Sequence, residues 1–201
     1  MDVVAGLQER GLDMPVLLRF GDILDTQIAT LYQSFEKAIQ DANYQGQYKG
    51  VYPIKVNQQQ QVIEELTASG CRHGHGLEAG SKPELIAALA YFPENDGLLI
   101  CNGYKDEEFI DLALYATKLG IQTVLVVETP REVELIINRS EHIGITPTIG
   151  VRMKLSSKAG GHWQESGGDQ SVFGLNTAQV IAVVEKLKAC GASSILVLPI
   201  E

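Results

Sequence analysis

The stretch Gly50-Val-Tyr-Pro-Ile-Lys-Val-Asn-Gln58 decides how the rest of the chain is interpreted. Its apolar and partly β-branched run over residues 51–56 is typical of a short strand, and Asn57 is a good N-cap for a following helix. Side chains alternate across a strand, so the face opposite Lys55 holds Tyr52, Ile54 and Val56. The pattern therefore predicts a strand that ends in a lysine and leads into a helix.

Lys55 is the residue to which this pattern assigns chemistry. If helices cover the apolar face, Lys55 points to the other side of the sheet, where burial favours a neutral amine over an ammonium. A neutral amine is a nucleophile that forms a Schiff base with a carbonyl, either of a substrate or of pyridoxal phosphate. The alternative is an ordinary lysine whose head reaches water from the strand end, and geometry alone favours that alternative.

Composition places the chain among globular proteins and argues against several functions. Of its 201 residues, 45% are hydrophobic, which is enough for one sizeable core. The net charge of -9, without any cluster of Lys and Arg, argues against a nucleic-acid surface. Three scattered cysteines indicate a reducing compartment, and no apolar run is long enough to span a bilayer. We therefore predict a cytoplasmic protein that binds neither nucleic acid nor membrane.

Strand and helix patterns alternate along the chain. A strand is predicted at residues 15–20 and an amphipathic helix at residues 22–42. Further strands are predicted to start near residues 51, 73, 97, 123 and 147, and a last strand spans residues 193–198. Helix-capping signals lie between these strands at Ser81–Glu84, Thr129–Glu132 and Asn176. Such a repeat requires a parallel sheet, either doubly wound or closed into a barrel.

The barrel is the better of these two architectures. The glycine-rich turn of a dinucleotide-binding sheet is missing, because the glycines at 74 and 76 are followed by a third at 80 instead of 79. We therefore predict an α/β fold, a (β/α)8 barrel of the TIM type. Closure takes eight strands and, counted from the lysine strand onward, only six are predicted, so about six of the eight units are present. The unpaired edges should associate with another chain, and the 201 residues alone should be inactive.

Chemistry in such barrels sits at the carboxyl ends of the strands. That rule selects Lys55, Glu78, Asn102 and Glu128, and the alternation of apolar residues turns Arg152 toward the same interior. Lys55, Glu78 and Arg152 would then converge on one mouth. The alternative is an ion-pair network that fills the barrel without any cofactor.

Two further features leave alternatives open. The glycine-rich stretch at residues 156–175 forms a long loop at the same end of the barrel, as a mobile lid would. Its His162 is either a base or a solvated side chain. Cys71, His73 and His75 stand at alternate positions and could bind zinc, but no fourth ligand is apparent nearby, so no metal site is predicted.

Five motifs, in this order and spacing, carry a resemblance over the chain from about residue 15 onward. They are Val-Tyr-Pro-Ile-Lys-Val-Asn-Gln (51–58), Gly-Leu-Glu-Ala-Gly-Ser-Lys-Pro-Glu-Leu (76–85), Cys-Asn-Gly-Tyr-Lys-Asp (101–106), Gly-Val-Arg (150–152) and Ser-Gly-Gly-Asp-Gln-Ser-Val-Phe-Gly-Leu (166–175). With these motifs the chain resembles the biosynthetic arginine decarboxylases of bacteria.

The resemblance implies a pyridoxal-phosphate enzyme of the alanine-racemase-like class, which converts L-arginine to agmatine for polyamine synthesis. Lys55 matches the lysine that holds the cofactor, and Glu78 and Arg152 match acidic and arginine positions that line it. Magnesium enters only as an ion that the family suggests. By the same resemblance, residues 1–20 belong with a second, β-rich domain, residues 21–201 form a partial cofactor-binding barrel, and the protein is a homo-oligomer.

Two alternatives remain beside this interpretation. One is a decarboxylase of the same class that acts on another basic amino acid, because nothing in these residues identifies a guanidinium group. The other is a relative without catalytic activity that serves as a regulatory partner. The presence of Lys55 favours an enzyme, because a silent relative has no physical need for a lysine at that position.

Overall fold

The computed structural model describes residues 3–93, 96–154, 174–190 and 193–197, and within them six strands form one parallel sheet. The strands are β1 (Val51–Pro53), β2 (Gly76–Ala79), β3 (Leu98–Cys101), β4 (Gln122–Val127), β5 (Thr148–Arg152) and β6 (Ser193–Val197). Their order in the sheet is their order in the sequence, which leaves β1 and β6 at the two edges. A consecutive parallel order is that of a barrel wall, because the order of a doubly wound sheet reverses at a switch point.

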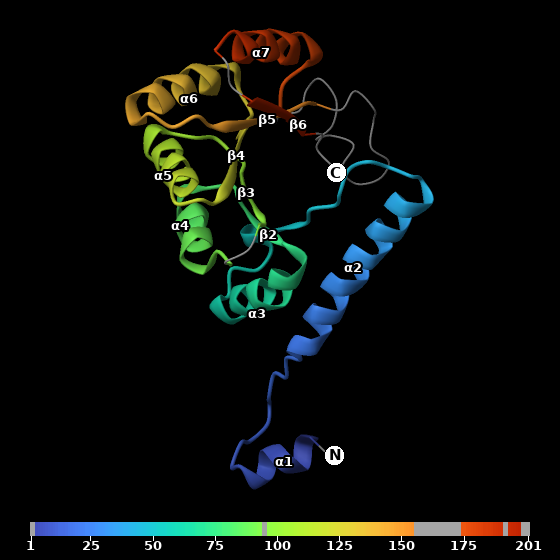
Figure 1. Cartoon of the computed structure of the whole chain (residues 1–201). Helices are drawn as coiled ribbons and strands as arrows, with labels where there is room; N and C mark the ends of the chain where they lie inside the picture. The colour runs from blue at the N-terminus through green and yellow to red at the C-terminus, as the bar shows by residue number, and fades with distance from the viewer. Residues whose placement is uncertain (1–2, 94–95, 155–173, 191–192, 198–201) are drawn as a thin grey trace.

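Helices connect the strands and cover one face of the sheet, as Figure 1 shows. They are α3 (Gln60–Gly70), α4 (Lys82–Tyr91), α5 (Glu107–Lys118), α6 (Pro130–Ile143) and α7 (Thr177–Ala189). Helix α4 packs on β2, α5 and α6 pack on β4, and α7 packs on β6. The opposite face of the sheet is the one toward which the predicted site residues were placed.

The core lies between the sheet and these helices. Leu77 and Leu99 from the strands and Leu85 and Leu114 from the helices are each exposed by 1% or less. Burial of a side chain of this size stabilises the fold by about 1.5–3 kcal/mol. Strand β4 is buried on both faces from residue 123 to residue 127, which explains why its sequence is a continuous hydrophobic run.

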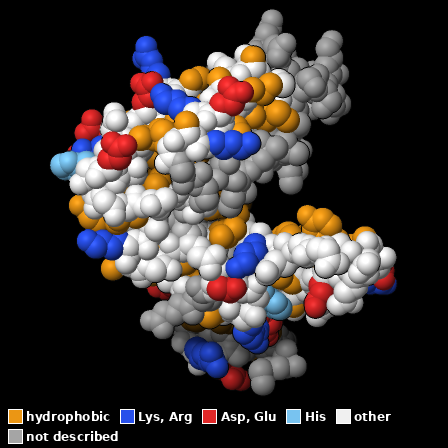
Figure 2. All heavy atoms as spheres, turned by 45° about the horizontal axis from the view of Figure 1, so that its top comes forward, with side chains coloured by type: hydrophobic (Ala, Val, Ile, Leu, Met, Phe, Trp, Pro, Cys, Tyr) orange, Lys and Arg blue, Asp and Glu red, His pale blue; other side chains and the backbone are white. Residues whose placement is uncertain are grey.

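Two helices, α1 (Val3–Glu9) and α2 (Gly21–Asp41), precede the sheet. In Figure 1, α2 stands apart from α4, α5 and α6, and Figure 2 shows it as an arm with a hollow between it and the body of the molecule. Several large hydrophobic side chains of this arm are exposed, among them Phe20, Ile23 and Phe35. The N-terminal segment is therefore the part of the described chain that is packed least.

Tyr32 attaches α2 to the amino-terminal ends of the first two strands. Its hydroxyl oxygen accepts the Gly50 N–H at 2.9 Å and lies 3.3 Å from Nδ1 of His75. Its ring stacks on the ring of His73, with centroids 4.9 Å apart. Burial, and secondarily the neighbouring His73, lower the pKa of His75. These contacts fix α2 at the end of the sheet opposite the predicted site.

The structure corrects three predicted element boundaries. The strand predicted at residues 15–20 is wrong, because this segment has no neighbouring strand among the described residues. The first strand of the sheet ends at Pro53, and residues 54–56 form a 3-10 turn. The strand predicted from residue 73 begins only at Gly76, after a second 3-10 turn that ends at the left-handed Gly74. Apolar composition alone does not distinguish these short turns from strands.

Two of the four predicted helix caps are confirmed. Asn176 caps α7 together with Gln179, and the capping box at Thr129 begins α6. The box predicted at Ser81 is wrong: the Ser81 side chain makes no capping hydrogen bond, and the carboxylate of Glu84 accepts the Gly80 N–H at 2.8 Å instead. The carboxylate thus stabilises the turn between β2 and α4 from within the helix.

Three sequence predictions concern features that the structure leaves open. Among the described residues no helix has the length and hydropathy needed to cross a membrane. The assignment of residues 1–20 to a second domain stays a prediction. The predicted lid at residues 156–175, with His162, lies outside the described residues except for its last two positions.

Candidate active site

Lys55 lies just beyond the strand in which it was predicted. Pro53, the last residue of β1, is the sheet neighbour of Glu78 on β2, and the 3-10 turn carries Lys55 two residues further. This turn breaks the alternation of a strand, so that Ile54 is buried while Lys55 and Val56 are exposed. The prediction that Val56 shares the buried face is therefore wrong, and Lys55 is exposed, as in the alternative that geometry alone favoured.

The helix after Lys55 also begins later than expected. Its N-cap is Gln59, so the prediction that Asn57 caps it is wrong. Asn57 accepts the Gln59 N–H through its side-chain oxygen at 3.1 Å, which is a local turn contact two residues apart. This contact stabilises the chain between Lys55 and α3.

Glu78 is buried within β2, with 5% of the residue exposed. Its Oε1 accepts a hydrogen bond from Nδ2 of Asn102 at 3.0 Å. Its Oε2 is buried and has no hydrogen-bond partner among the described residues. An unpaired carboxylate oxygen in such a place is costly, and each one in a folded protein needs an explanation.

A tight turn after β3 supplies the partner of Glu78 and a second donor beside it. The Asn102 N–H donates to the carbonyl of Ala79 at 2.9 Å, which ties this turn to the end of β2. Gly103 has a φ of 72°, and a Cβ there would lie 2.1 Å from the carbonyl oxygen of Gly80. Only glycine fits this close approach of two backbones.

The Gly103 N–H connects this turn to the carboxyl end of β4. It donates to Oε1 of Glu128 at 2.8 Å, and Glu128 directly follows β4. Nη1 of Arg152, at the end of β5, lies 3.2 Å from each oxygen of the same carboxylate. The Glu128 side chain is 1% exposed and that of Arg152 is 29% exposed. The ion pair is therefore buried on its acidic side and reaches the surface on its basic side.

The carboxyl ends of β2, β3, β4 and β5 are thus joined by one chain of contacts. It runs from Glu78 through Asn102 and Gly103 to Glu128 and Arg152. The rule of strand ends selected Glu78, Asn102 and Glu128, and the alternation along the strand selected Arg152. Arg152 forms its ion pair with Glu128, which was not a member of the network of Lys55, Glu78 and Arg152 in the alternative, so that alternative stays a prediction.

Two residues of this end were missed as site residues by the sequence analysis. Lys105 and Glu132 lie behind the chain of contacts, are 7% and 5% exposed, and approach each other to 3.7 Å between Nζ and Oε2. Glu132 was noticed only as part of a capping box. The signal for Lys105 was its place in the turn after β3, within the motif at residues 101–106.

The described end of the predicted lid, residues 174–175, lies beside Arg152. Leu175 pairs in parallel with Met153, its N–H donates to the Arg152 carbonyl at 2.8 Å, and its carbonyl accepts the Lys154 N–H at 2.8 Å. The segment at residues 174–175 therefore extends the end of β5.

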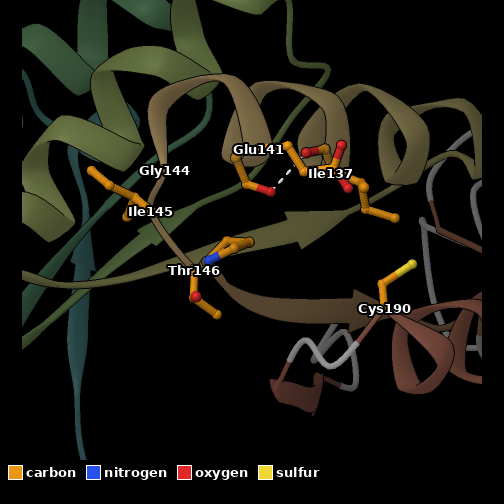
Figure 3. A pocket seen from close by; sticks show the side chains of 8 residues that line it. Ile137, Glu141, Gly144, Ile145, Thr146 and Cys190 are labelled. Atoms are coloured by element: carbon orange, nitrogen blue, oxygen red, sulfur yellow. Dashed lines mark hydrogen bonds between the residues drawn. The ribbon is translucent and has the colours of Figure 1, made fainter.

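Two cavities lie at the other end of the sheet. One of about 270 Å³ is lined by Ile137, Thr146 and Cys190 at the start of β5, as Figure 3 shows. Another, of about 530 Å³, is lined by Tyr32, His73 and their neighbours at the starts of β1 and β2. Neither contacts Glu78, Glu128 or Arg152, so the candidate site rests on the strand ends and not on these cavities.

The zinc alternative gains no support at the residues that suggested it. His73 stacks on Tyr32 and His75 lies within hydrogen-bonding distance of the same residue. Within the described ranges no group of three or more His, Cys, Asp or Glu side chains could hold a metal ion.

An alternating βα array with consecutive parallel strands, and with a lysine and charged side chains at the strand ends, defines part of a barrel built for chemistry at its carboxyl end. The chain belongs to the pyridoxal-dependent decarboxylases, because the family model of their pyridoxal binding domain matches residues 26–197. The predicted alanine-racemase-like α/β barrel class is thereby confirmed.

The curated relatives are named biosynthetic arginine decarboxylases. One from Tolumonas auensis is 49% identical over 189 residues, and one from Thermosynechococcus vestitus is 48% identical over 190 residues. Each alignment covers 94% of this chain and 30% of the relative. The chain therefore spans less than a third of the length of the relatives that it matches.

Solved structures agree with the fold. The biosynthetic arginine decarboxylase of Campylobacter jejuni superposes with a TM-score of 0.86 at 32% identity, over 98% of this chain and 32% of that one. A diaminopimelate decarboxylase from Helicobacter pylori superposes with a TM-score of 0.72 at 18% identity, over 98% of this chain and 46% of that one. At that lower identity the likeness shows the fold alone.

The described residues fit pyridoxal phosphate, the cofactor of this family. The buried Oε2 of Glu78 is an acceptor without a partner among the described residues, and it lies on the strand next to the one that leads to Lys55. An amine, a free carboxylate oxygen and the guanidinium of Arg152 match the aldehyde, the hydrogen-bond donors and the anionic groups of such a molecule.

Proposed function

We propose that the complete protein decarboxylates L-arginine to agmatine and carbon dioxide with pyridoxal phosphate as its cofactor. The observation that carries this proposal is the 49% identity with a biosynthetic arginine decarboxylase over 94% of the chain. The chain covers 30% of that relative, so the activity is assigned to the complete protein and not to these 201 residues.

The proposal gives three residues a role. Lys55 would hold the cofactor by its aldehyde carbon. Glu78 would accept a hydrogen bond from a donor of the cofactor or of the substrate, and Arg152, oriented by Glu128, would face an anionic group. The cofactor, when bound, supplies the electron sink that makes loss of carbon dioxide feasible. The protein contributes attachment, orientation and a fixed arrangement of charges.

Two other functions remain as alternatives. A decarboxylase of the same class for another basic amino acid would share these residues, because the described part of the chain contains none that we can assign to a guanidinium group. A relative without catalytic activity would keep the fold and lose the cofactor.

One experiment distinguishes these functions. The complete protein is titrated with pyridoxal phosphate and followed by absorption, and its turnover is then compared on arginine, ornithine, lysine and diaminopimelate. We expect a cofactor absorption band and agmatine as the preferred product. A preference for one of the other three amino acids would move the assignment to the same-class alternative, and failure to bind cofactor would favour the non-catalytic one.

The wider setting is part of the same proposal. The identity with relatives named biosynthetic supports a role in polyamine synthesis, and the scattered cysteines support a cytoplasmic location. Homo-oligomerisation stays a prediction from the unpaired strand edges. Magnesium stays a prediction that rests on family resemblance alone.

A further inference from the structure

A buried lysine lies behind the candidate site without any role in the proposed function. The Lys105 side chain is 0% exposed, although it follows a turn at the surface of the sheet. Its Nζ donates to the carbonyl of Gly103 at 2.6 Å and to the carbonyl of Val126 near the end of β4. One ammonium therefore connects the turn after β3 with the next strand.

The carboxylate of Glu132 makes the same connection from α6. Its Oε1 accepts the Lys105 N–H at 3.1 Å. Its Oε2 accepts the Glu128 N–H at 2.7 Å and the Thr129 N–H at 3.3 Å. Both carboxylate oxygens of Glu132 thus accept backbone N–H groups, Oε1 in the turn after β3 and Oε2 in the turn after β4.

These contacts fix the positions of Gly103 and Glu128, which form a hydrogen bond with each other in the candidate site. The Gly103 N–H and the Glu128 carboxylate are joined at 2.8 Å, and Glu128 in turn holds Arg152. Lys105 binds the carbonyl of Gly103, and Glu132 binds the N–H of Glu128. A shift of either turn would move the carboxylate that orients Arg152.

A buried charged pair is an expensive way to join two turns. Burial lowers the pKa of Lys105, and the charges of Glu132 and Glu128 oppose that shift. Apolar residues of similar volume often serve stability as well as such a pair does. Its specific bonds to backbone groups instead determine the relative position of the two turns.

We propose that Lys105 and Glu132 are positioning residues, which set the turns after β3 and β4 so that Glu128 holds Arg152 in place for the cofactor. This inference rests on the proposed function, since it assigns Arg152 to the cofactor. Neither residue contacts the reacting atoms in this account; both act through Gly103 and Glu128.

The test uses the complete protein with Lys105→Met, Glu132→Gln and both changes together. Each substitution removes a charge at nearly constant volume. Lys82→Met is the matched control, because Lys82 also forms ion pairs with the start of α5, to Asp106 and Glu108, but its side chain is 30% exposed. Three quantities are measured: hydrogen exchange of the peptide containing Gly103 without cofactor, cofactor affinity by absorption, and kcat and KM separately.

We expect faster exchange at Gly103, cofactor affinity and kcat each lowered roughly 10- to 100-fold, and a double variant no worse than the worse single one, because the pair acts as a unit. The control should match the parent protein. Variants with a lower melting temperature but parental exchange, affinity and kcat would show a purely structural role and overturn the proposal.

Failure of the proposed function has a different signature. If the parent protein neither binds pyridoxal phosphate nor decarboxylates an amino acid, the proposed function is wrong and the positioning role falls with it. Exchange at Gly103 would still show in that case whether Lys105 and Glu132 hold the two turns together.

Discussion

The carboxyl ends of β2 and β4 each carry a buried glutamate, but the two carboxylates are bound differently. Both oxygens of Glu128 lie 3.2 Å from Arg152, and one of them also accepts the Gly103 N–H. Glu78 uses one oxygen to bind Asn102 and has the other buried without a partner among the described residues. A satisfied carboxylate stabilises the fold, whereas an unsatisfied one costs free energy until a donor reaches it.

The two ends are connected through one turn. Asn102 and Gly103 are consecutive residues, and one donates to Glu78 while the other donates to Glu128. We call the Glu128 site at β4 the closed end, because both carboxylate oxygens are bound, and the Glu78 site at β2 the open end, because one oxygen has no partner among the described residues. Through this turn the closed end positions the open end. We infer that Glu78 offers the cofactor or substrate its free acceptor while Glu128 only orients Arg152 toward it, and the following predictions test this difference.

The largest effect is expected at Lys55, beside the open end. In the complete protein, Lys55→Ala should lower kcat by roughly 10³-fold or more, because a covalent attachment point cannot be replaced by neighbouring groups. Lys154→Ala, past the end of β5 on the closed side, is the control and should change kcat far less. Steady-state decarboxylation of arginine measures both.

Borohydride reduction of the cofactor-loaded protein identifies the lysine directly. Peptide mapping should find the cofactor on Lys55. If the labelled peptide contained Lys82, Lys105 or Lys154, the assignment of Lys55 and the comparison of the two ends would both be wrong.

The next effect is expected at the turn that connects the two ends. Gly103→Ala should lower the free energy of unfolding by about 2–4 kcal/mol, since the residue is left-handed and a Cβ would lie 2.1 Å from the Gly80 carbonyl. Gly120→Ala is the matched control, with a φ of 92° and no atom within 4 Å of its Cβ. Equal losses, measured by denaturant unfolding, would mean that the close approach to Gly80 contributes nothing.

The same substitution should affect stability at Glu128 and cofactor binding at Glu78. Glu128→Gln should lower the free energy of unfolding by about 1–3 kcal/mol, because it removes the buried charge from the ion pair with Arg152. Glu78→Gln should leave stability without cofactor nearly unchanged and weaken cofactor binding about tenfold or more, as loss of a charged acceptor does. Unfolding and absorption titrations of both variants provide the comparison. If Glu78→Gln destabilised the protein as much as Glu128→Gln, the open end would be structural.

The residues at the strand ends could be predicted from the sequence, but their hydrogen-bond and ion-pair partners could not. Alternation along a strand and the rule of strand ends placed Glu78, Asn102, Glu128 and Arg152 at one edge, because those rules depend only on local geometry. They cannot show which carboxylate Arg152 binds. That choice depends on the turn at Gly103, whose close contact with Gly80 joins residues from different βα units.

The failures have local physical causes. The 3-10 turn after Pro53 has the same apolar composition as a strand, so it was predicted as one and the surroundings of Lys55 were wrong. Lys105 was missed because a lysine in a turn normally reaches water, and only the carbonyls of Gly103 and Val126 explain its burial.

The smallest effect concerns Cys101, which ends β3 between the two glutamate sites. Burial raises the pKa of its thiol to about 12, from about 9, and the charge of Glu78 adds to this shift while that of Lys105 opposes it. Between these two values the unfolded chain has lost this proton and the folded protein keeps it. Stability therefore falls with rising pH across this window, by up to about 1.4 kcal/mol per pH unit.

Unfolding of the parent protein and of Cys101→Ala at several alkaline pH values measures this contribution as the difference between the two slopes. Parallel curves would contradict it. The comparison of the two ends then becomes quantitative, because removal of the Glu78 charge should lower the pKa of Cys101 and removal of the Lys105 charge should raise it. Glu78→Gln should therefore make the alkaline loss of stability smaller, and Lys105→Met should make it larger. If the alkaline loss of stability changed in the same direction in both variants, the charges of Glu78 and Lys105 would not act on the pKa of Cys101 in opposite directions.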